Sequence, residues 1–343
     1  MQVAKLVIGL VGAGSIAQSH LRAFVESPLV DKVFLADPSD QARENTVRQF
    51  GIVERAFETI EEMLGSAPID VVDICTPHYL HKPQAIVALQ AGKHVIVEKP
   101  MAMNVAECDE MLEAAAGAGR RLFVALCQRM FPAHIRARQL IEEGEIGQPF
   151  LGVVNVFGNE MERMRDTASW KGSWEKAGGG ALFDTGYHAV YMLQHFLGPA
   201  RAVIASLKQL AMEDDRKADD TGMLAMEMDG AMGCVTATYA ATGDRWTEER
   251  RIVGEQGSLL IRDDPDDGLP LLLLRGEEVI PVPVVNPLRV HPYGVARVLE
   301  HFLECIVKEE PEQVTAAEAR AAVAVCQAAY ESAREGRKVE VMF

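Results

Sequence analysis

The chain has 343 residues, which is more than one ordinary domain holds, so we expect two domains. Its composition, 48% hydrophobic and 24% charged, is typical of a globular protein with sizeable cores. The formal net charge of −16 argues against nucleic acid or an anionic membrane as a partner, because both bind basic surfaces.

The six cysteines form no CxxC pair and have no metal-ligand spacing. We therefore expect reduced thiols in the core of a cytoplasmic protein, with neither a disulfide framework nor a metal site. The N-terminus "MQVAKLVIGLVGAGSIA" is similar to a signal peptide, but we interpret it as a β-strand that runs into a glycine turn. No apolar run reaches the roughly 18 residues that span a bilayer. The cysteines are Cys75, Cys108, Cys127, Cys234, Cys305 and Cys326.

The first 126 residues alternate short apolar runs rich in β-branched residues with helical patterns. This alternation predicts an α/β domain, a Rossmann-type doubly wound parallel sheet covered by helices on both faces, over residues 1–126. The predicted strands are 5–11, 32–37, 70–76, 94–98 and 121–126, and the predicted helices are 15–26, 40–50, 58–65, 79–91 and 104–118.

Residues 127–343 have a different sequence pattern, with many segments in which apolar and polar residues alternate and few helical segments. They predict an α+β domain with a large, mostly antiparallel open sheet. Two acidic tracts, 212–220 and 262–268, are expected to be solvated loops or hairpin tips. The predicted strands are 150–158, 201–210, 222–229, 232–241, 248–254, 257–262 and 270–282, and the predicted helices are 132–143, 181–197, 292–308 and 315–336.

The first strand is followed by "GLVGAGSIA", in which Gly12, Gly14 and Ala17 have the spacing of a dinucleotide-binding turn. In such turns the first glycine allows the tight turn, the second lets the backbone approach a pyrophosphate, and the helix N-terminus binds the phosphates. Asp37, twenty residues after Ala17, can accept hydrogen bonds from the ribose hydroxyls and would repel a 2′-phosphate. NAD is therefore favoured over NADP, although Arg43 is near in sequence. The predicted cofactor-binding residues here are Gly12, Gly14, Ser15, Ile16 and Asp37.

The stretch "HVIVEKPMAMN" places Lys99 just past the carboxyl end of a predicted parallel strand. Ligands bind at that edge of an open α/β sheet. Pro100 keeps Lys99 out of the helical region, so its side chain can be directed at a ligand. An isolated lysine at a strand end is more often a surface charge, but a desolvated ammonium can also serve in catalysis.

The stretch "GGGALFDTGYH" at 178–188 has three glycines followed by an aspartate and a histidine four residues apart. On a helix over 181–197, Asp184, His188, Tyr191 and His195 would share one stripe. The glycines would let the chain pass close to substrate and cofactor, where a Cβ would collide. Two alternatives are a polar stripe that faces water and a metal pair, which lacks a clear third ligand. His20, on the first predicted helix, is expected to be a packing residue.

Four motifs, "GLVGAGSIA", "CTPHYLH", "VEKPMA" and "GGGALFDTGYH", occur in an order that resembles the Gfo/Idh/MocA oxidoreductase family, named after glucose–fructose oxidoreductase and inositol dehydrogenase. The resemblance implies hydride transfer between NAD and a carbon of a small polyhydroxylated substrate such as a sugar or cyclitol. It also implies a homodimer or homotetramer formed through the open sheet. The implied catalytic residues are Lys99, Asp184 and His188, and the residues implied to lie beside the cofactor are Thr76, Pro77, His81, Glu98 and Lys99.

Two other functions remain open on the same fold. One is a reductase of a non-sugar carbonyl, such as an amino-acid semialdehyde or a linear tetrapyrrole. The other is a non-catalytic, nicotinamide-binding regulatory protein, which would have no chemical need for Lys99, Asp184 and His188. Either Lys99 or His188 could transfer the proton, because their titrations can be coupled.

Overall fold

The computed structural model describes residues 5–212, 217–242, 246–263, 268–284 and 290–342. The chain divides into two compact units, each described by itself below. Unit 1 comprises Met1–Cys127 and Pro292–Arg320, and unit 2 comprises Gln128–His291 and Ala321–Phe343. The two domains expected from the sequence, 1–126 and 127–343, stay a prediction.

Unit 1 contains a six-stranded, wholly parallel sheet with the strand order β3-β2-β1-β4-β5-β6. This is the order of a doubly wound dinucleotide-binding fold, so the predicted fold class is confirmed. Strand β3 was missed, because only its two end residues, Val53 and Phe57, are buried and the middle is polar. The strands are β1 Leu6–Val11, β2 Val30–Ala36, β3 Val53–Phe57, β4 Val71–Ile74, β5 His94–Val97 and β6 Leu122–Val124.

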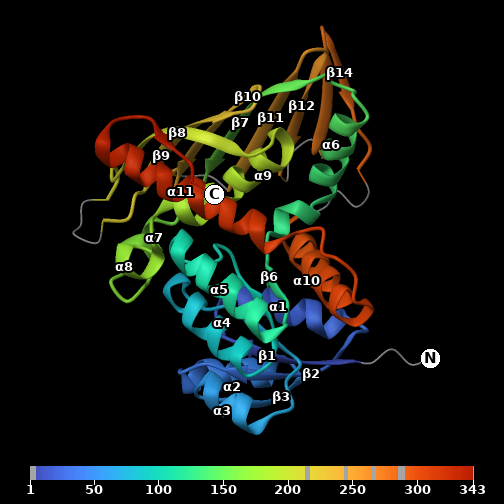
Figure 1. Ribbon diagram of the computed structural model, residues 1–343, viewed down its shortest axis with the longest axis vertical. Helices are drawn as coiled ribbons and strands as arrows, with labels where there is room; N and C mark the ends of the chain where they lie inside the picture. Colours follow the sequence, from blue (N-terminus) through green and yellow to red (C-terminus); the bar gives the residue numbers. More distant parts are fainter. Residues whose placement is uncertain (1–4, 213–216, 243–245, 264–267, 285–289, 343) are drawn as a thin grey trace. The chain divides into compact units, whose positions relative to one another are not determined.

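The helices of unit 1 lie close to their predicted bounds, and Figure 1 shows α4 and α5 packed side by side. A late segment of the chain returns to this unit as α10, where Phe302 stacks on Phe123 with ring centroids 4.6 Å apart. Arg121 donates a hydrogen bond to the carbonyl oxygen of Cys305 at 2.7 Å, which fixes the same helix. The helices are α1 Ser15–Glu26, α2 Asp40–Gln49, α3 Ile60–Ser66, α4 His81–Gln90, α5 Val105–Ala118 and α10 Val290–Lys308.

Unit 2 contains a nine-stranded sheet with the order β14-β13-β12-β11-β7-β10-β9-β8-β15. Strands β10 and β7 pair in parallel and the other neighbours are antiparallel, which confirms the predicted open sheet. The predicted strand 270–282 is two strands that turn at Gly276, whose φ is 57°. The strands are β7 Pro149–Phe157, β8 Ala200–Lys208, β9 Thr221–Met228, β10 Ala231–Thr238, β11 Thr247–Gly254, β12 Gly257–Arg262, β13 Leu271–Arg275, β14 Glu278–Pro281 and β15 Val339–Glu340.

Helix α9 packs on this sheet against β7 and β10, where glycines make room for its side chains. A Cβ added at Gly152 would lie 2.4 Å from Leu193, and one at Gly233 would lie 3.3 Å from the same leucine. Among the described residues, no helix is long and apolar enough to cross a membrane. The remaining helices are α6 Pro132–Glu142, α7 Met161–Arg165, α8 Trp174–Ala177, a π-helix at Leu182–Gly186, α9 Tyr187–Leu197 and α11 Ala316–Glu335.

The acidic tract 212–220 ends in two buried aspartates, so its prediction as a solvated loop is wrong at Asp219 and Asp220. Residues 213–216 of this tract, and 264–267 of the second one, lie outside the described residues. The Oδ2 atom of Asp220 accepts hydrogen bonds from the backbone N–H groups of Ala211 and Met212, each at 2.8 Å. Both carboxylates are buried because they bind backbone donors that would otherwise lack a partner.

Candidate active site

The two glycines of the first turn have different structural roles. Gly12 has a φ of 96°, and a Cβ there would lie 2.7 Å from the carbonyl oxygen of Cys75, so the protein's own packing requires this glycine. Gly14 precedes α1 as its N-cap and makes no side-chain cap hydrogen bond. A Cβ at Gly14 would meet no heavy atom within 4 Å. The open space beside the first turn of α1 therefore suits an anionic group that binds backbone N–H donors.

Asp37 follows β2 and lies beside this turn. Its Oδ2 accepts a hydrogen bond from the N–H of Ala13 at 2.8 Å, and its Oδ1 accepts one from Ser39 at 2.9 Å. Each carboxylate oxygen has a second lone pair that can accept from a hydroxyl. Arg43 donates to the backbone carbonyl oxygen of Asp37 at 2.5 Å and pairs with Asp40. The arginine nearest to Asp37 in sequence is thus already engaged, and the residues present fit the ribose of NAD better than a 2′-phosphate.

His81 connects the segments that follow β4 and β5. Its ring nitrogens lie 2.9 Å from the carbonyl oxygen of Thr76 and 2.8 Å from that of Pro100, and its side chain is fully buried. Burial lowers the pKa of His81 below its ordinary value, against the opposing effect of these hydrogen bonds. Pro77 begins a short 3-10 helix at His78–Leu80 between these contacts. His81 thus links the two segments that are expected to line the cofactor.

Glu98 and Lys99 directly follow β5. Glu98 is buried and its Oε2 accepts a hydrogen bond from the backbone N–H of Lys99 at 3.1 Å, while Lys99 is partly exposed. Burial acts to raise the pKa of Glu98, but the hydrogen bond and charge of His20, together with Lys99, hold it below the ordinary value. The peptide bond between Lys99 and Pro100 is cis. The partly exposed Lys99 comes directly after a buried carboxylate.

Backbone conformation and close contacts within the protein account for the three glycines at 178–180. This reason is separate from the predicted approach of a ligand. Gly178 has a φ of 78°, and a Cβ at Gly179 would lie 2.2 Å from the hydroxyl of Tyr330. A Cβ at Gly180 would lie only 1.8 Å from the backbone carbonyl oxygen of Asp219. The carboxylate of Asp219 also accepts hydrogen bonds from the N–H groups of Gly180 and Leu182, at 2.8 and 2.9 Å.

The helix that follows begins differently from the predicted α-helix. Residues Leu182–Gly186 form a π-helix, and the α-helix starts only at Tyr187. The bonds from Asp219 to the backbone at Gly180 and Leu182 hold this first turn. Single π-helical turns are frequent at functional sites, and this one carries Asp184. The alternative that the polar stripe of this helix faces water does not hold at Asp184 and Tyr191, because both side chains are buried.

Asp184 is held by two donors that the sequence did not reveal. Its Oδ2 accepts hydrogen bonds from the ammonium of Lys171 at 2.6 Å and from the hydroxyl of Tyr239 at 2.7 Å. Burial, followed by the nearby charge of Asp184, raises the pKa of Tyr239 well above its ordinary value, so this tyrosine is a donor. Asp184 thus forms an ion pair with Lys171 and a hydrogen bond with Tyr239.

His188 is oriented by a tyrosine one helical turn away. Its Nδ1 lies 2.8 Å from the hydroxyl of Tyr191, and the oxygen of Tyr191 accepts a hydrogen bond from the backbone N–H of Gln128 at 3.2 Å. Spacing alone could have suggested this pair, because residues three apart on a helix are neighbours. Unit 2 thus brings Asp184 and His188 onto one helical segment, and Lys99 belongs to unit 1.

Comparison with known proteins identifies the family of the chain. The model of an oxidoreductase family with an NAD-binding Rossmann fold matches residues 6–126, and the model of its C-terminal alpha/beta domain matches residues 138–341. The chain belongs to the Gfo/Idh/MocA oxidoreductase family.

Relatives with known names are similar over most of the chain. A levoglucosan dehydrogenase of Pseudarthrobacter phenanthrenivorans is 29% identical over 299 residues, which are 77% of this chain and 75% of that protein. The scyllo-inositol 2-dehydrogenase (NAD(+)) of Bacillus subtilis is 26% identical, with coverage of 97% and 95%. The WlbA dehydrogenase of Bordetella pertussis, solved in complex with NADH and UDP-GlcNAcA, superposes with a TM-score of 0.87 at 27% identity, covering 100% of this chain and 99% of that one.

Proposed function

We propose that this protein is an NAD-dependent oxidoreductase that moves a hydride between the nicotinamide ring and a carbinol or carbonyl carbon of a sugar, cyclitol or related polyol. One observation carries the proposal. A dinucleotide-type turn with Asp37 occurs in the same chain as Lys99, Asp184 and His188, in a family whose relatives include levoglucosan and scyllo-inositol dehydrogenases. A regulatory protein would not need the three polar groups.

The proposed cofactor is NAD, which when bound supplies the hydride acceptor or donor. The N–H groups at the start of α1, with Gly14, Ser15 and Ile16, would hold its pyrophosphate. The carboxylate of Asp37, already positioned by Ala13, would accept from the adenosine ribose hydroxyls. Thr76, Pro77, His81 and Glu98 would lie beside the nicotinamide ribose, and the hydrogen bonds of His81 would also hold the segments after β4 and β5 together.

The proposed chemical roles follow from charge and protonation. His188, whose ordinary pKa is near neutrality, would exchange the proton of the reacting hydroxyl, with its ring held by Tyr191. The ammonium of Lys99 would stabilise negative charge that develops on that oxygen. Asp184 would stay ionised beside Lys171 and orient the imidazole or a neighbouring substrate hydroxyl.

We also propose that the protein is a cytoplasmic homodimer or homotetramer. All six cysteines are free and five of them are buried, which fits a reducing compartment. The outward face of the large sheet exposes apolar side chains on neighbouring strands, with Ile204 at 52%, Met223 at 57% and Met232 at 54% exposure. Exposed large apolar side chains on one face of a sheet are consistent with the proposed contact between copies. Light scattering that gives only the 37.5 kDa monomer would contradict this assembly.

The roles of Lys99 and His188 can be tested by substitution. Lys99→Met keeps the aliphatic stem and removes the charge and the donors, so turnover should fall by a factor on the order of 10² to 10⁴. The affinity for NAD should change little, because the glycine turn and Asp37 hold the cofactor. His188→Ala should behave similarly, and the double variant should be less than additive if both groups serve one step. Turnover like that of the wild type in Lys99→Met would rule out its proposed role.

A further inference from the structure

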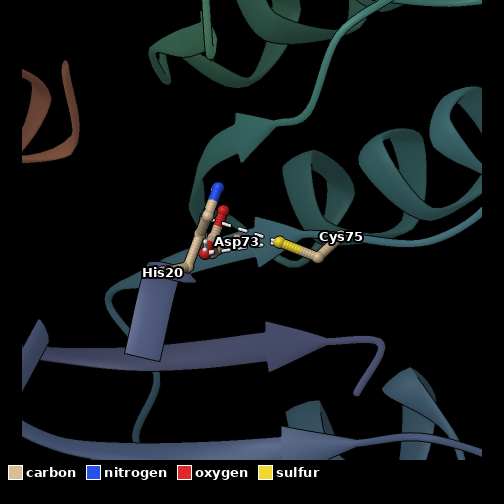
Figure 2. A group of neighbouring side chains, drawn as sticks. All are labelled: His20, Asp73 and Cys75. Atoms are coloured by element: carbon tan, nitrogen blue, oxygen red, sulfur yellow. Dashed lines mark hydrogen bonds and ion pairs between the residues drawn. The ribbon is translucent and has the colours of Figure 1, made fainter. Parts of the chain in front are cut away.

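A cluster of buried polar groups in unit 1 reaches Glu98, one of the residues assigned to the cofactor, through His20, to which no role has been assigned so far. Figure 2 shows His20, from α1, directed at Asp73 on β4, with Cys75 beside them. The Nδ1 of His20 lies 2.7 Å from Oδ2 of Asp73, and its Nε2 lies 3.1 Å from Oε1 of Glu98. His20 and Asp73 are fully buried, and Glu98 is 7% exposed.

The contacts of His20 with Asp73 and Glu98 favour the positively charged form of its ring. A neutral imidazole has one N–H donor and one lone pair, so it can donate to only one of the two carboxylates. Its second nitrogen would then face a carboxylate oxygen with no proton between them. Only the imidazolium donates to both Asp73 and Glu98. Burial acts to lower the pKa of His20, but Asp73 and then Cys75 raise it well above the ordinary value of 6.5.

A metal ion is the other occupant that the cluster could suggest, since His20, Asp73 and Cys75 each offer one ligand atom. The distance between the two ligand atoms argues against it. The 2.7 Å between Nδ1 and Oδ2 is that of a hydrogen bond, and a metal would need these atoms further apart. The arrangement is that of an ion pair with a thiol beside it.

The cluster connects directly to the end of β5. The Oε1 of Glu98 accepts from His20, and its Oε2 accepts from the backbone N–H of Lys99. The backbone N–H of Glu98 donates to Ile74 on β4 at 2.9 Å. Along this chain the charges alternate in sign from Asp73 through His20 and Glu98 to Lys99. Each buried carboxylate thus has a cation beside it, as burial of charge requires.

We propose that His20, as a buried imidazolium between Asp73 and Glu98, is a positioning residue for Lys99. Its hydrogen bond holds the Glu98 carboxylate in the position from which that carboxylate accepts the backbone N–H of Lys99. Its positive charge also offsets the negative charge of Glu98, so that Glu98 does not stabilise the ammonium of Lys99 too strongly. The inference rests on the proposed function, in which Lys99 contacts the substrate. Three titratable groups face His20: Asp73 on β4, Cys75 just after β4, and Glu98 just after β5. On α1 itself, the ring of Phe24 lies 6.4 Å from the ring of His20.

The charge of His20 is measurable without any substrate. In the apo-protein, ¹⁵N NMR of the imidazole, assigned with His20→Gln, should show both ring nitrogens protonated at neutral pH, where an ordinary histidine is mostly neutral. A spectrum of the neutral ring at pH 7 would overturn the inference. The same spectrum recorded with added zinc should not change, and loss of the Nδ1 proton on adding zinc would also overturn it.

The link to Lys99 is tested by kinetics with a matched control. His94→Gln changes a half-buried histidine at the opposite end of β5, where its Nδ1 accepts from the backbone N–H of Arg121. We expect wild-type kinetics in that control. His20→Gln should lower kcat by a factor on the order of 10², the scale for small misplacement of a reacting group, with the Kd for NAD unchanged. The pH profile of kcat/KM of this variant should move to higher pH, because the Glu98 carboxylate, without the positive charge of His20 beside it, favours the ammonium form of Lys99 more strongly.

The outcomes separate this inference from the proposed function. If Lys99→Met loses turnover and His20→Gln behaves like His94→Gln, the proposed function stands and the role of His20 is overturned. If Lys99→Met keeps its turnover, both the proposed role of Lys99 and the role of His20 are overturned. Should His20→Gln fail to fold, the double variant His20→Gln/Asp73→Asn removes one charge of each sign and leaves Glu98 paired with Lys99. Loss of kcat and the alkaline shift in that variant support the inference, and an unchanged profile overturns it.

Discussion

Gly180→Ala tests how the chain holds the segment that carries Asp184. The new methyl group would lie 1.8 Å from the backbone carbonyl oxygen of Asp219 and 2.5 Å from its nitrogen, so one of the two backbones must move. That movement breaks contacts that join the same two segments. The N–H of Gly180 donates to the Asp219 carboxylate at 2.8 Å, and the N–H of Ala181 donates to the Asp219 carbonyl at the same distance.

The magnitude follows from these contacts. Hydrogen bonds to a charged group contribute about 1.5 to 3 kcal/mol each, and a neutral one contributes about 1 kcal/mol. Forcing a methyl group into a packed core costs about 1 to 3 kcal/mol more. Gly180→Ala should therefore destabilise unit 2 by about 4 kcal/mol or more, a large part of the 5 to 15 kcal/mol that keeps an ordinary domain folded.

The three tryptophans provide the assay, because Trp170, Trp174 and Trp246 all belong to unit 2. Urea unfolding followed by tryptophan fluorescence should show a much lower midpoint for Gly180→Ala. The control is Gly117→Ala in helix α5 of unit 1, where a Cβ meets nothing within 4 Å. That change should leave the tryptophan transition unchanged. A midpoint for Gly180→Ala equal to that of the wild type would refute the reasoning.

Three further predictions concern the cofactor turn, the Asp184 network and pH. Gly14→Ala should leave stability nearly unchanged but weaken NAD binding by about tenfold or more, equivalent to 1.4 kcal/mol, in a fluorescence titration; an unchanged Kd would contradict the proposed phosphate site. Lys171→Met removes the cation beside Asp184, a pair that is partly exposed, so it should cost only about 1 to 2 kcal/mol of stability in urea unfolding and lower turnover. Wild-type turnover would show that Asp184 does not need this partner. His20 has its pKa raised on folding, so its contribution to stability is fully present below pH 6.5 and is lost as pH rises toward the folded pKa. The unfolding free energy should therefore fall by up to about 1.36 kcal/mol per pH unit above that point, and His20→Gln should flatten this slope; equal slopes in the two proteins would argue against a charged His20.

The sequence was sufficient for the elements whose pattern is local. Strand β1 is a continuous apolar run, β4 is apolar except for Asp73, and their predicted positions agree with the structure within a few residues. Strand β3 was missed because a short strand at the edge of the sheet buries only its ends. The acidic tract was misread because Asp219 looks like a solvated residue until its backbone donors, thirty-nine positions earlier at Gly180, are known.

The candidate site shows the same limit. Motifs identified Lys99, Asp184 and His188 as the predicted catalytic groups, but motifs carry no information about partners that tertiary folding supplies. Tyr239 is 55 residues away from Asp184 in sequence, and Asp73 is 53 residues away from His20. For the glycines before Asp184 the structure supplies a reason that the sequence did not, since their close neighbours are other segments of the protein, and the approach of a ligand stays a prediction.

The most direct test of the proposed function is to follow the reduction of NAD by the purified protein across a panel of sugars, inositols and other polyols, with NADP in parallel. We expect NADH formation with at least one polyol, at a higher kcat/KM for NAD than for NADP because Asp37 disfavours the 2′-phosphate. The same reaction should be lost in Lys99→Met while that variant still binds NAD. Binding of NAD by the wild type without turnover on any member of the panel would contradict the account.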